Sequence, residues 1–95
     1  MLKIENGNCA LSGDLIFQTT PNLKESGDFL LKESPDSEIT FDLKNVGKVD
    51  SSALALFLSW LRIAQGKSQT LRFANAPLAL RELAALYSLQ NILPL

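Results

Sequence analysis

Residues 49–58 of this 95-residue chain read VDSSALALFL, which places one carboxylate and two hydroxyls directly before a run of apolar residues. Asp and Ser are preferred at the start of a helix, because their side-chain oxygens accept hydrogen bonds from backbone N–H groups that the first turn leaves unpaired. The segment predicts a helix from about Ser51 to Gln65, closed by Gly66 in the usual C-terminal position.

The polar residues at the start of this helix have two interpretations. The first is helix capping, for which Asp50 and the serines are well suited. The second is binding, because the positive end of the helix dipole favours added negative charge, so a hydroxyl here can receive a phosphate or a partner's hydrogen-bond donor. The residue pattern alone leaves both interpretations open.

The predicted helix carries apolar residues on two sides. At 100° per residue, Leu54, Phe57, Leu58 and Leu61 form an ordinary core stripe. The other side is also partly apolar, so the helix is either buried on both faces or binds a partner with its outer face. Because a domain of this size usually covers its sheet with one helix layer, we favour a partner-binding patch. Its predicted members are Asp50, Ser51, Ser52, Ala55, Leu56, Ser59, Trp60 and Ile63.

The rest of the chain alternates strands and helices. Period-two patterns predict short strands near residues 2–4, 9–11, 15–17, 39–43 and 71–73, with turns at 5–8 and 12–14 and a loop at 44–48. Helical patterns predict helices from Thr20 to about Glu33 and from Leu78 to about Tyr87. The apolar tail, residues 89–95, is expected to pack back on the domain as a short edge strand. This order implies right-handed βαβ crossovers and an α/β fold with a partly parallel sheet.

Length and composition exclude several classes of protein. Ninety-five residues cannot build two separate cores, so residues 1–95 are expected to form a single domain. The net charge is −1 and the nine Lys and Arg are scattered, which argues against nucleic acid as a partner. There is no histidine, and no paired-carboxylate, nucleophile–base or Gly-rich phosphate pattern. We therefore expect no enzyme, no metal site and no cofactor, and Cys9 is expected to be a buried packing thiol.

The sequence also bears on the membrane. The N-terminus lacks the pattern of a secretory signal, and the longest apolar run, residues 53–61, is far shorter than the ~20 residues that span a bilayer. We expect a cytoplasmic chain without direct membrane insertion, which reaches a membrane only through a partner.

Four segments together resemble the STAS domain family, named for sulfate transporters and anti-sigma factor antagonists. They are LSGDL at 11–15, ITFDL at 39–43, VDSSAL at 49–54 and TLRF at 70–73, and the resemblance covers essentially the whole chain. It implies a STAS-like mixed sheet of about four to five strands with helices packed mainly on one face, and no catalytic activity. It also implies that the Asp-Ser loop and the helix after it meet partner proteins.

One branch of this family consists of anti-sigma factor antagonists, in which a serine of this loop is phosphorylated by a partner kinase. Ser52 matches the phosphorylated position, with Ser51 as the neighbouring candidate. That branch usually continues with glycines, whereas this chain has Ala53 and Ala55. The alternative partner on this interpretation is an anti-sigma factor kinase.

The other branch, which we favour, is the B subunit of the Mla intermembrane phospholipid transport system. The chain is similar to it at Asp50-Ser51, in the Leu-Ala-Leu run at 54–56, in LYSL at 86–89 and in ILP at 92–94. The resemblance implies an accessory subunit, contacted through Ser51, on the cytoplasmic ATPase of an ABC transporter, and through it an association with the permease complex at the inner membrane. That machinery maintains outer-membrane lipid asymmetry. A small enzyme or nucleotide-binding protein would need a phosphate cradle, which the sequence lacks.

Overall fold

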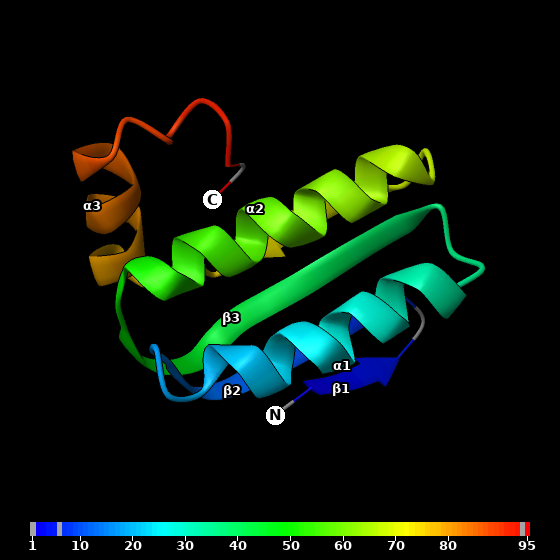
Figure 1. Cartoon of the computed structure of the whole chain (residues 1–95), viewed down its shortest axis with the longest axis horizontal. Coiled ribbons are helices and arrows are strands. Elements are labelled where there is room, and N and C mark those ends of the chain that lie inside the picture. The colour runs from blue at the N-terminus through cyan, green and yellow to red at the C-terminus, as the bar shows by residue number, and fades with distance from the viewer. Residues whose placement is uncertain (1, 6, 94) are drawn as a thin grey trace.

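The computed structural model of the chain describes residues 2–5, 7–93 and 95, with side chains from residue 7 onward. These residues form seven elements, and Figure 1 shows how they are arranged. They are β1 (Leu2–Glu5), β2 (Asn8–Leu15), α1 (Thr20–Glu33), β3 (Glu38–Val49), α2 (Ser51–Gly66), β4 (Thr70–Ala74) and α3 (Leu78–Leu86).

The strands form one mixed sheet in the order β1-β2-β3-β4. The strands β2, β3 and β4 are parallel, and β1 adds an antiparallel edge next to β2. The connection from β2 to β3 passes through α1, and that from β3 to β4 passes through α2. The predicted α/β class with βαβ crossovers is therefore confirmed.

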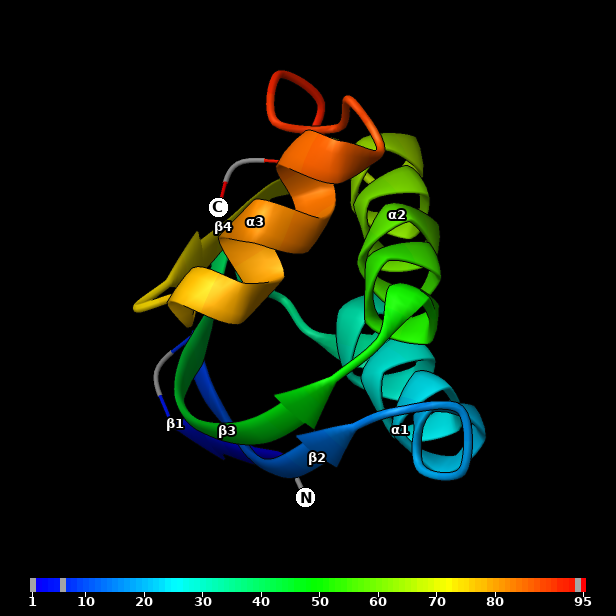
Figure 2. The same ribbon diagram turned by 90° about the vertical axis from the view of Figure 1, so that its left-hand side faces the viewer.

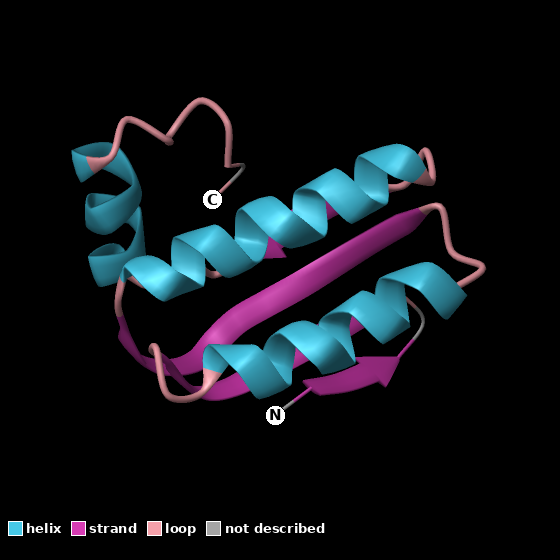
Figure 3. Ribbon diagram, in the orientation of Figure 1, coloured by secondary structure: helices cyan, strands magenta, loops and turns pink. Residues whose placement is uncertain are grey.

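The helices α1 and α2 lie side by side over one face of the sheet (Figures 1 and 3). The view in Figure 2 separates this helix layer from the strands and shows α3 at one end of the domain, beside the start of α2. Hydrogen bonds connect the C-terminal ends of the two long helices. The Lys67 ammonium group, just after α2, donates hydrogen bonds to the carbonyls of Leu31 (2.9 Å) and Lys32 (2.6 Å) in the last turn of α1.

An aromatic cluster fills the space between the helices and the sheet. The Trp60 ring in α2 stacks on Phe41 of β3 with centroids 4.7 Å apart, and Phe57 lies 4.5 Å from Phe73 of β4. Cys9 is fully buried, as the sequence predicted. Leu54 and Phe57 in α2 are buried as well, whereas Leu58 and Leu61, also predicted for the core stripe, are only half-buried.

The two central strands are longer than the sequence indicated. Residues 12–14, predicted as a turn, lie inside β2, and residues 44–48, predicted as a loop, lie inside β3. The two polar segments pair with each other: Ser12 lies opposite Asn45, and Gly13 lies opposite Val46. This pairing is irregular, with register shifts on both sides of residues 12–13. Polar, turn-forming residues thus continue the ladder because each strand supplies the other's hydrogen-bonding partner.

The C-terminal part also differs from the expectation. Gly66 belongs to α2, and Ser68, with φ 56°, takes the left-handed conformation beyond it. The tail is no edge strand: Leu93 donates a backbone hydrogen bond to Leu89 (2.9 Å) within a series of turns and is 1% exposed. The predicted packing of the tail on the domain is confirmed in its described residues, but by a buried leucine rather than by strand pairing. Likewise, the strand predicted at 15–17 does not form a separate element.

The close approach of α1 to α2 depends on Gly27. A Cβ at this position would overlap with the Trp60 indole ring. Gly27→Ala is therefore expected to destabilise the domain by about 1–3 kcal/mol, because the ring must shift, even though alanine is the better helix former. The free energy of urea unfolding, followed by circular dichroism, measures this effect.

Gly66→Ala is the matched control. A Cβ on this last residue of α2 would meet no atom within 4 Å, so the substitution is expected to be neutral or to stabilise the domain by up to about 1 kcal/mol. Equal effects of the two alanines would contradict the contact between Gly27 and Trp60.

Candidate protein-binding surface

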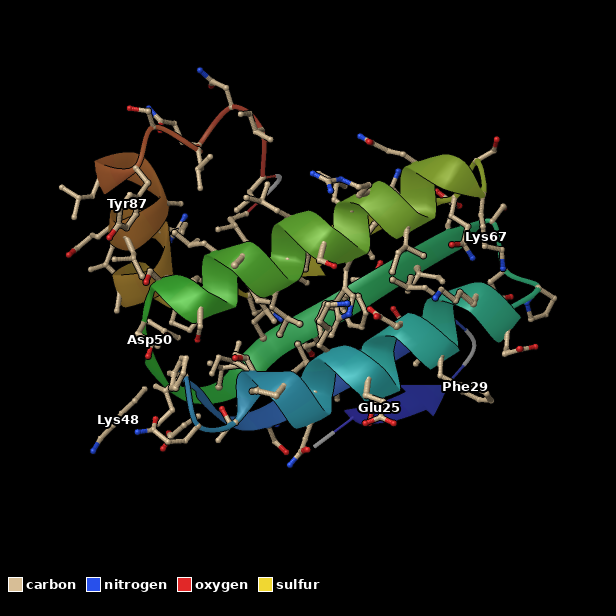
Figure 4. The ribbon with its side chains drawn as sticks, viewed as in Figure 1. Glu25, Phe29, Lys48, Asp50, Lys67 and Tyr87 are labelled. Carbon is tan, nitrogen blue, oxygen red and sulfur yellow. The ribbon has the colours of Figure 1, made fainter. Side chains whose placement is uncertain are left out.

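Asp50 organises the start of α2. It is the N-cap residue, in extended conformation, and its Oδ1 accepts hydrogen bonds from the Ser52 backbone N–H (2.9 Å) and the Ser52 hydroxyl. The capping function predicted from the sequence is therefore present, with one carboxylate oxygen satisfying the first turn. Figure 4 shows Asp50 at this end of α2.

The second oxygen of Asp50 reaches across to the loop between β2 and α1. Oδ2 accepts a hydrogen bond from the Phe17 backbone N–H (2.9 Å), and the Asp50 N–H donates to the Leu15 carbonyl (3.1 Å). Asp50 thus holds two chain segments, separated by 33 residues, next to each other. The consequence is a fixed arrangement of Phe17 beside the first turn of α2.

These hydrogen bonds lower the pKa of Asp50 below its ordinary value, first through the Ser52 side chain and then through the Phe17 backbone. A lowered folded-state pKa stabilises the fold above the unfolded value of about 4, and this contribution disappears as the pH falls through the folded value. Asp50→Asn is expected to lower stability at pH 6 and to have a smaller effect at pH 3, where the contribution of the ionised carboxylate is reduced. Urea unfolding at the two pH values measures this, and a pH-independent effect of the substitution would contradict it.

The two serines differ in environment. Ser51 is exposed, and its hydroxyl makes no hydrogen bond to another described residue, whereas Ser52 is half-buried and donates its hydroxyl proton to Asp50. Ser51 is therefore free to contact a partner. Ser52 is part of the cap.

An apolar groove of about 360 Å³ lies beside these serines, between the N-terminal turns of α1 and α2. Its residues come from two regions of the sequence, and those of α2 are the predicted Ser52, Ala55, Leu56 and Ser59. The opposite wall consists of Phe17, Thr20, Pro21 and Lys24. The groove therefore forms only where α1, with the loop before it, packs beside α2.

Sequence reasoning missed Phe17 as a surface residue. It was assigned to a strand, but it lies in the loop after β2 and its side chain is 75% exposed. An exposed phenylalanine next to a cap and an apolar groove is a typical anchor for a protein partner. No pattern in the sequence marks it, because the hydrogen bond that holds its backbone beside α2 joins residues 33 positions apart.

Two members of the predicted patch are not surface residues. Leu56 is 4% exposed and Trp60 is fully buried, so the expectation that they supply contact area to a partner across the outer face of α2 is wrong. The reason is that α1 packs beside α2 and covers this side, so α2 is buried both against the sheet and against α1. Leu56 reaches the surface only as a lining residue of the groove.

The remaining predicted members divide by position. Ala55 is exposed, and Ser59 and Ile63 are half-buried. Ala55 and Ser59 line the groove, and Ser51 lies next to its lining residue Ser52. Ile63 lies one turn beyond Ser59 along α2 and does not line the groove. We define the α2 N-terminal surface as Phe17, Ser51, Ala55 and Ser59 around this groove.

The described residues were also compared with the requirements of a metal site and of a membrane-spanning helix. No group of three or more Asp, Glu or Cys side chains in residues 7–93 and 95 is placed to hold a metal ion. None of the helices in the same residues has the length and apolar character needed to cross a bilayer.

Comparison with known proteins gives a family and several solved structures with the same fold. A family model described as Mlab, STAS domain matches residues 4–94. No curated protein gives a significant match. Among solved structures, a chain of the Acinetobacter MlaFEDB complex in an ATP-bound conformation superposes with a TM-score of 0.84 at 25% identity, over 100% of this chain and 98% of that one.

Anti-sigma factor antagonists share the fold at lower identity. The Bacillus cell fate determinant SpoIIAA in its phosphorylated form has a TM-score of 0.73 and 14% identity, over 98% of this chain and 86% of that one. A putative antagonist from Thermotoga maritima has a TM-score of 0.79 and 18% identity, over 98% and 81% of the respective chains. Because the family match spans nearly all of the described fold, from β1 to the C-terminal tail, the chain belongs to the Mlab, STAS domain family.

Proposed function

We propose that this chain is a non-catalytic, cytoplasmic subunit that binds the ATPase of a phospholipid-transporting ABC complex and supports its assembly and activity. The observation that carries this proposal is the likeness to a chain of the ATP-bound MlaFEDB complex, which extends over all of this chain and 98% of that one. A match over nearly all of both chains favours the same kind of module, used as a subunit of such a complex.

The α2 N-terminal surface provides the docking site in this proposal. Phe17 offers a rigid apolar anchor, and the groove beside it can receive an apolar side chain of the ATPase. Small residues, Ser51 and Ala55, allow a partner's backbone to approach closely. Because Asp50 fixes both sides of the groove before binding, little conformational entropy is lost on association.

The proposal also accounts for the lack of catalysis that we infer. The ionised carboxylate at the site, Asp50, is already saturated by the backbone of Ser52 and Phe17 and by the Ser52 hydroxyl. A general base needs a free acceptor within reach of a substrate proton. Asp50 and Ser52 thus hold the first turn of α2 in place, and the exposed Phe17 and Ala55 offer contact area to a partner.

The experiment that tests this function is purification of the tagged chain from its own cells, with bound proteins identified by mass spectrometry. We expect an ABC ATPase, together with the permease subunit that it carries. The complex reconstituted from purified ATPase and this chain should then elute as one species. Recovery of a Ser/Thr kinase-like anti-sigma factor in place of the ATPase would overturn the proposal.

The second candidate is an anti-sigma factor antagonist regulated at Ser52. It is favoured by one specific observation: the Ser52 hydroxyl lies in the first turn of α2, where the helix dipole stabilises a phosphate. Against it, the hydroxyl donates to Asp50, so a phosphate would lie next to a carboxylate. Incubation with a cognate kinase and ATP should give one phosphate, lost in Ser52→Ala, if this candidate is right.

A further inference from the structure

The outer side of α3 is apolar although it faces solvent. At about 100° per residue, Leu80 and Ala84 point toward the core, and both are buried. The opposite side consists of exposed residues with small or apolar side chains around one glutamate, and we call it the α3 face: Leu78, Ala79, Glu82, Ala85, Leu86 and the C-cap residue Tyr87. Leu78, Leu86 and Tyr87 are each more than half exposed. Such a cluster indicates a surface that another molecule covers.

The α3 face lies at the same end of the domain as the α2 N-terminal surface. In Figure 2, α3 and the start of α2 both lie toward the viewer, with the loop between β2 and α1 below them. Figure 4 shows Tyr87 at the end of α3 and Asp50 at the start of α2 on this same side. Asp50 in turn holds the backbone of the exposed Phe17 through a hydrogen bond of 2.9 Å. One partner can therefore contact both surfaces at the same time.

The groove at the α2 N-terminal surface is too small to be the whole interface with the ATPase. It has eight described lining residues, whereas a stable interface has about 20–30 residues on each side. The interface must therefore extend over neighbouring surface. Toward α1 this surface carries Lys24 and Asp28, which pair with each other, and charged residues are depleted in the centres of interfaces. The apolar and aromatic side chains of the α3 face favour an extension in that direction.

The α3 face has one charged residue at its centre. Glu82 is exposed at the midpoint of α3, and it forms no salt bridge with a described residue. Arg81 is the only other charged side chain in the sequence from 73 to 95, and it lies about 100° round the helix, at the margin of the face. A partner that covers Glu82 without supplying a cation would bury an unpaired charge. The surface that fits the α3 face is therefore apolar with a Lys or Arg near its centre.

We propose that the ATPase covers the α3 face together with the α2 N-terminal surface, with apolar side chains around a Lys or Arg opposite Glu82. This inference rests on the proposed function and adds the chemistry of the partner's surface to it. A second copy of the chain fits the face poorly. Two α3 helices packed antiparallel about their midpoints would place Glu82 opposite Glu82 of the second copy, and like charges in such a contact repel each other.

Two substitutions in α3 test the inference by isothermal titration calorimetry with the ATPase that co-purifies with this chain. Leu86→Lys replaces an apolar contact by a cation, and Glu82→Arg reverses the central charge. We expect each substitution to weaken binding by roughly tenfold or more. Both side chains are exposed, and a cation is favourable in the last turn of a helix, so the urea midpoints of the variants should equal that of the parent.

Matched controls lie on α1, outside both surfaces. Phe29→Lys makes the same kind of change at an exposed apolar residue, and Glu33→Arg makes it at an exposed glutamate. Both controls should bind the ATPase as the parent does. Parent-like affinity of Leu86→Lys and Glu82→Arg, or equal weakening in the controls, overturns the inference, while loss of binding in Ser51→Arg alone leaves the proposed function standing. No binding of the ATPase by the parent chain overturns both.

Sedimentation velocity of the chain alone tests the competing occupant of the α3 face. We expect a monomer, because the central Glu82 opposes self-association. A dimer that Leu86→Lys converts into monomers would assign the face to a second copy of the chain and would overturn the inference.

Discussion

Ser51→Arg is expected to weaken binding of the ATPase by roughly 100-fold or more while the domain stays folded. Ser51 is exposed at the start of α2, its hydroxyl makes no hydrogen bond to another described residue, and it lies beside the groove that Phe17 and Ala55 flank. A long cationic side chain there would hold the partner away from the groove and would bury a charge without a counter-ion. Isothermal titration calorimetry with the ATPase that co-purifies with this chain measures the affinity.

Gln65→Arg is the matched control for this substitution. Gln65 is exposed on the last turn of the same helix, about 21 Å from Ser51 along the axis. The control adds the same side chain to the same helix and should leave binding unchanged. Both variants should unfold within about 1 kcal/mol of the parent, since arginine at the two ends of a helix changes only the dipole interaction. Wild-type affinity of Ser51→Arg would mean that the ATPase binds elsewhere.

Trp60→Ala is expected to have the largest effect on stability, about 3–5 kcal/mol. The indole is fully buried, stacks on Phe41 at 4.7 Å, lies 6.0 Å from Phe57 and fills the space above Gly27. Its removal opens a cavity at the junction of both helices and the sheet. Since a domain of this size has only about 5–15 kcal/mol of stability, the variant should be partly unfolded at 37 °C. Urea unfolding followed by circular dichroism measures the loss.

Trp60→Phe separates packing from the polar atom of the indole. Trp60 Nε1 is buried without a hydrogen-bond partner among the described residues, which is an unfavourable feature that phenylalanine removes. The smaller ring retains aromatic contact with Phe41. We expect Trp60→Phe to cost much less than Trp60→Ala. A similar loss in the two variants would show that the indole is anchored by its nitrogen and not by its packing.

These substitutions separate two functions of α2 that the sequence merged into one patch. Trp60 and Leu56 are needed for the fold, because α1 and the sheet enclose them. Ser51 and Ala55, on the first turns, are exposed and remain available for a partner. A substitution of Trp60 would therefore reduce binding by unfolding the domain. A substitution of Ser51 would reduce binding by changing the contact surface of a folded domain.

The local patterns of the sequence were sufficient for the three helices and most of their boundaries, and for the position of the four strands in the chain, although they also predicted strands at 15–17 and in the tail that do not form. The helix from Thr20 to Glu33 has the predicted bounds, and α2 and α3 differ from the prediction by one residue. The cap at Asp50 was also correctly predicted. Each of these features depends on periodicity or on hydrogen bonds between residues a few positions apart, and such information is contained in a single stretch of chain.

The surface required the tertiary structure. Whether Leu56 and Trp60 face solvent depends on α1, which lies beside α2 although it is separated from it by β3. The extension of β2 and β3 through polar residues depends on their pairing with each other. The backbone of Phe17 is held beside the first turn of α2 by a hydrogen bond across 33 residues. The amino-acid sequence by itself thus determined the helices and the centres of the strands, because these follow from near neighbours. The full length of the strands and the covered and open faces were decided only by the packing of distant segments against one another.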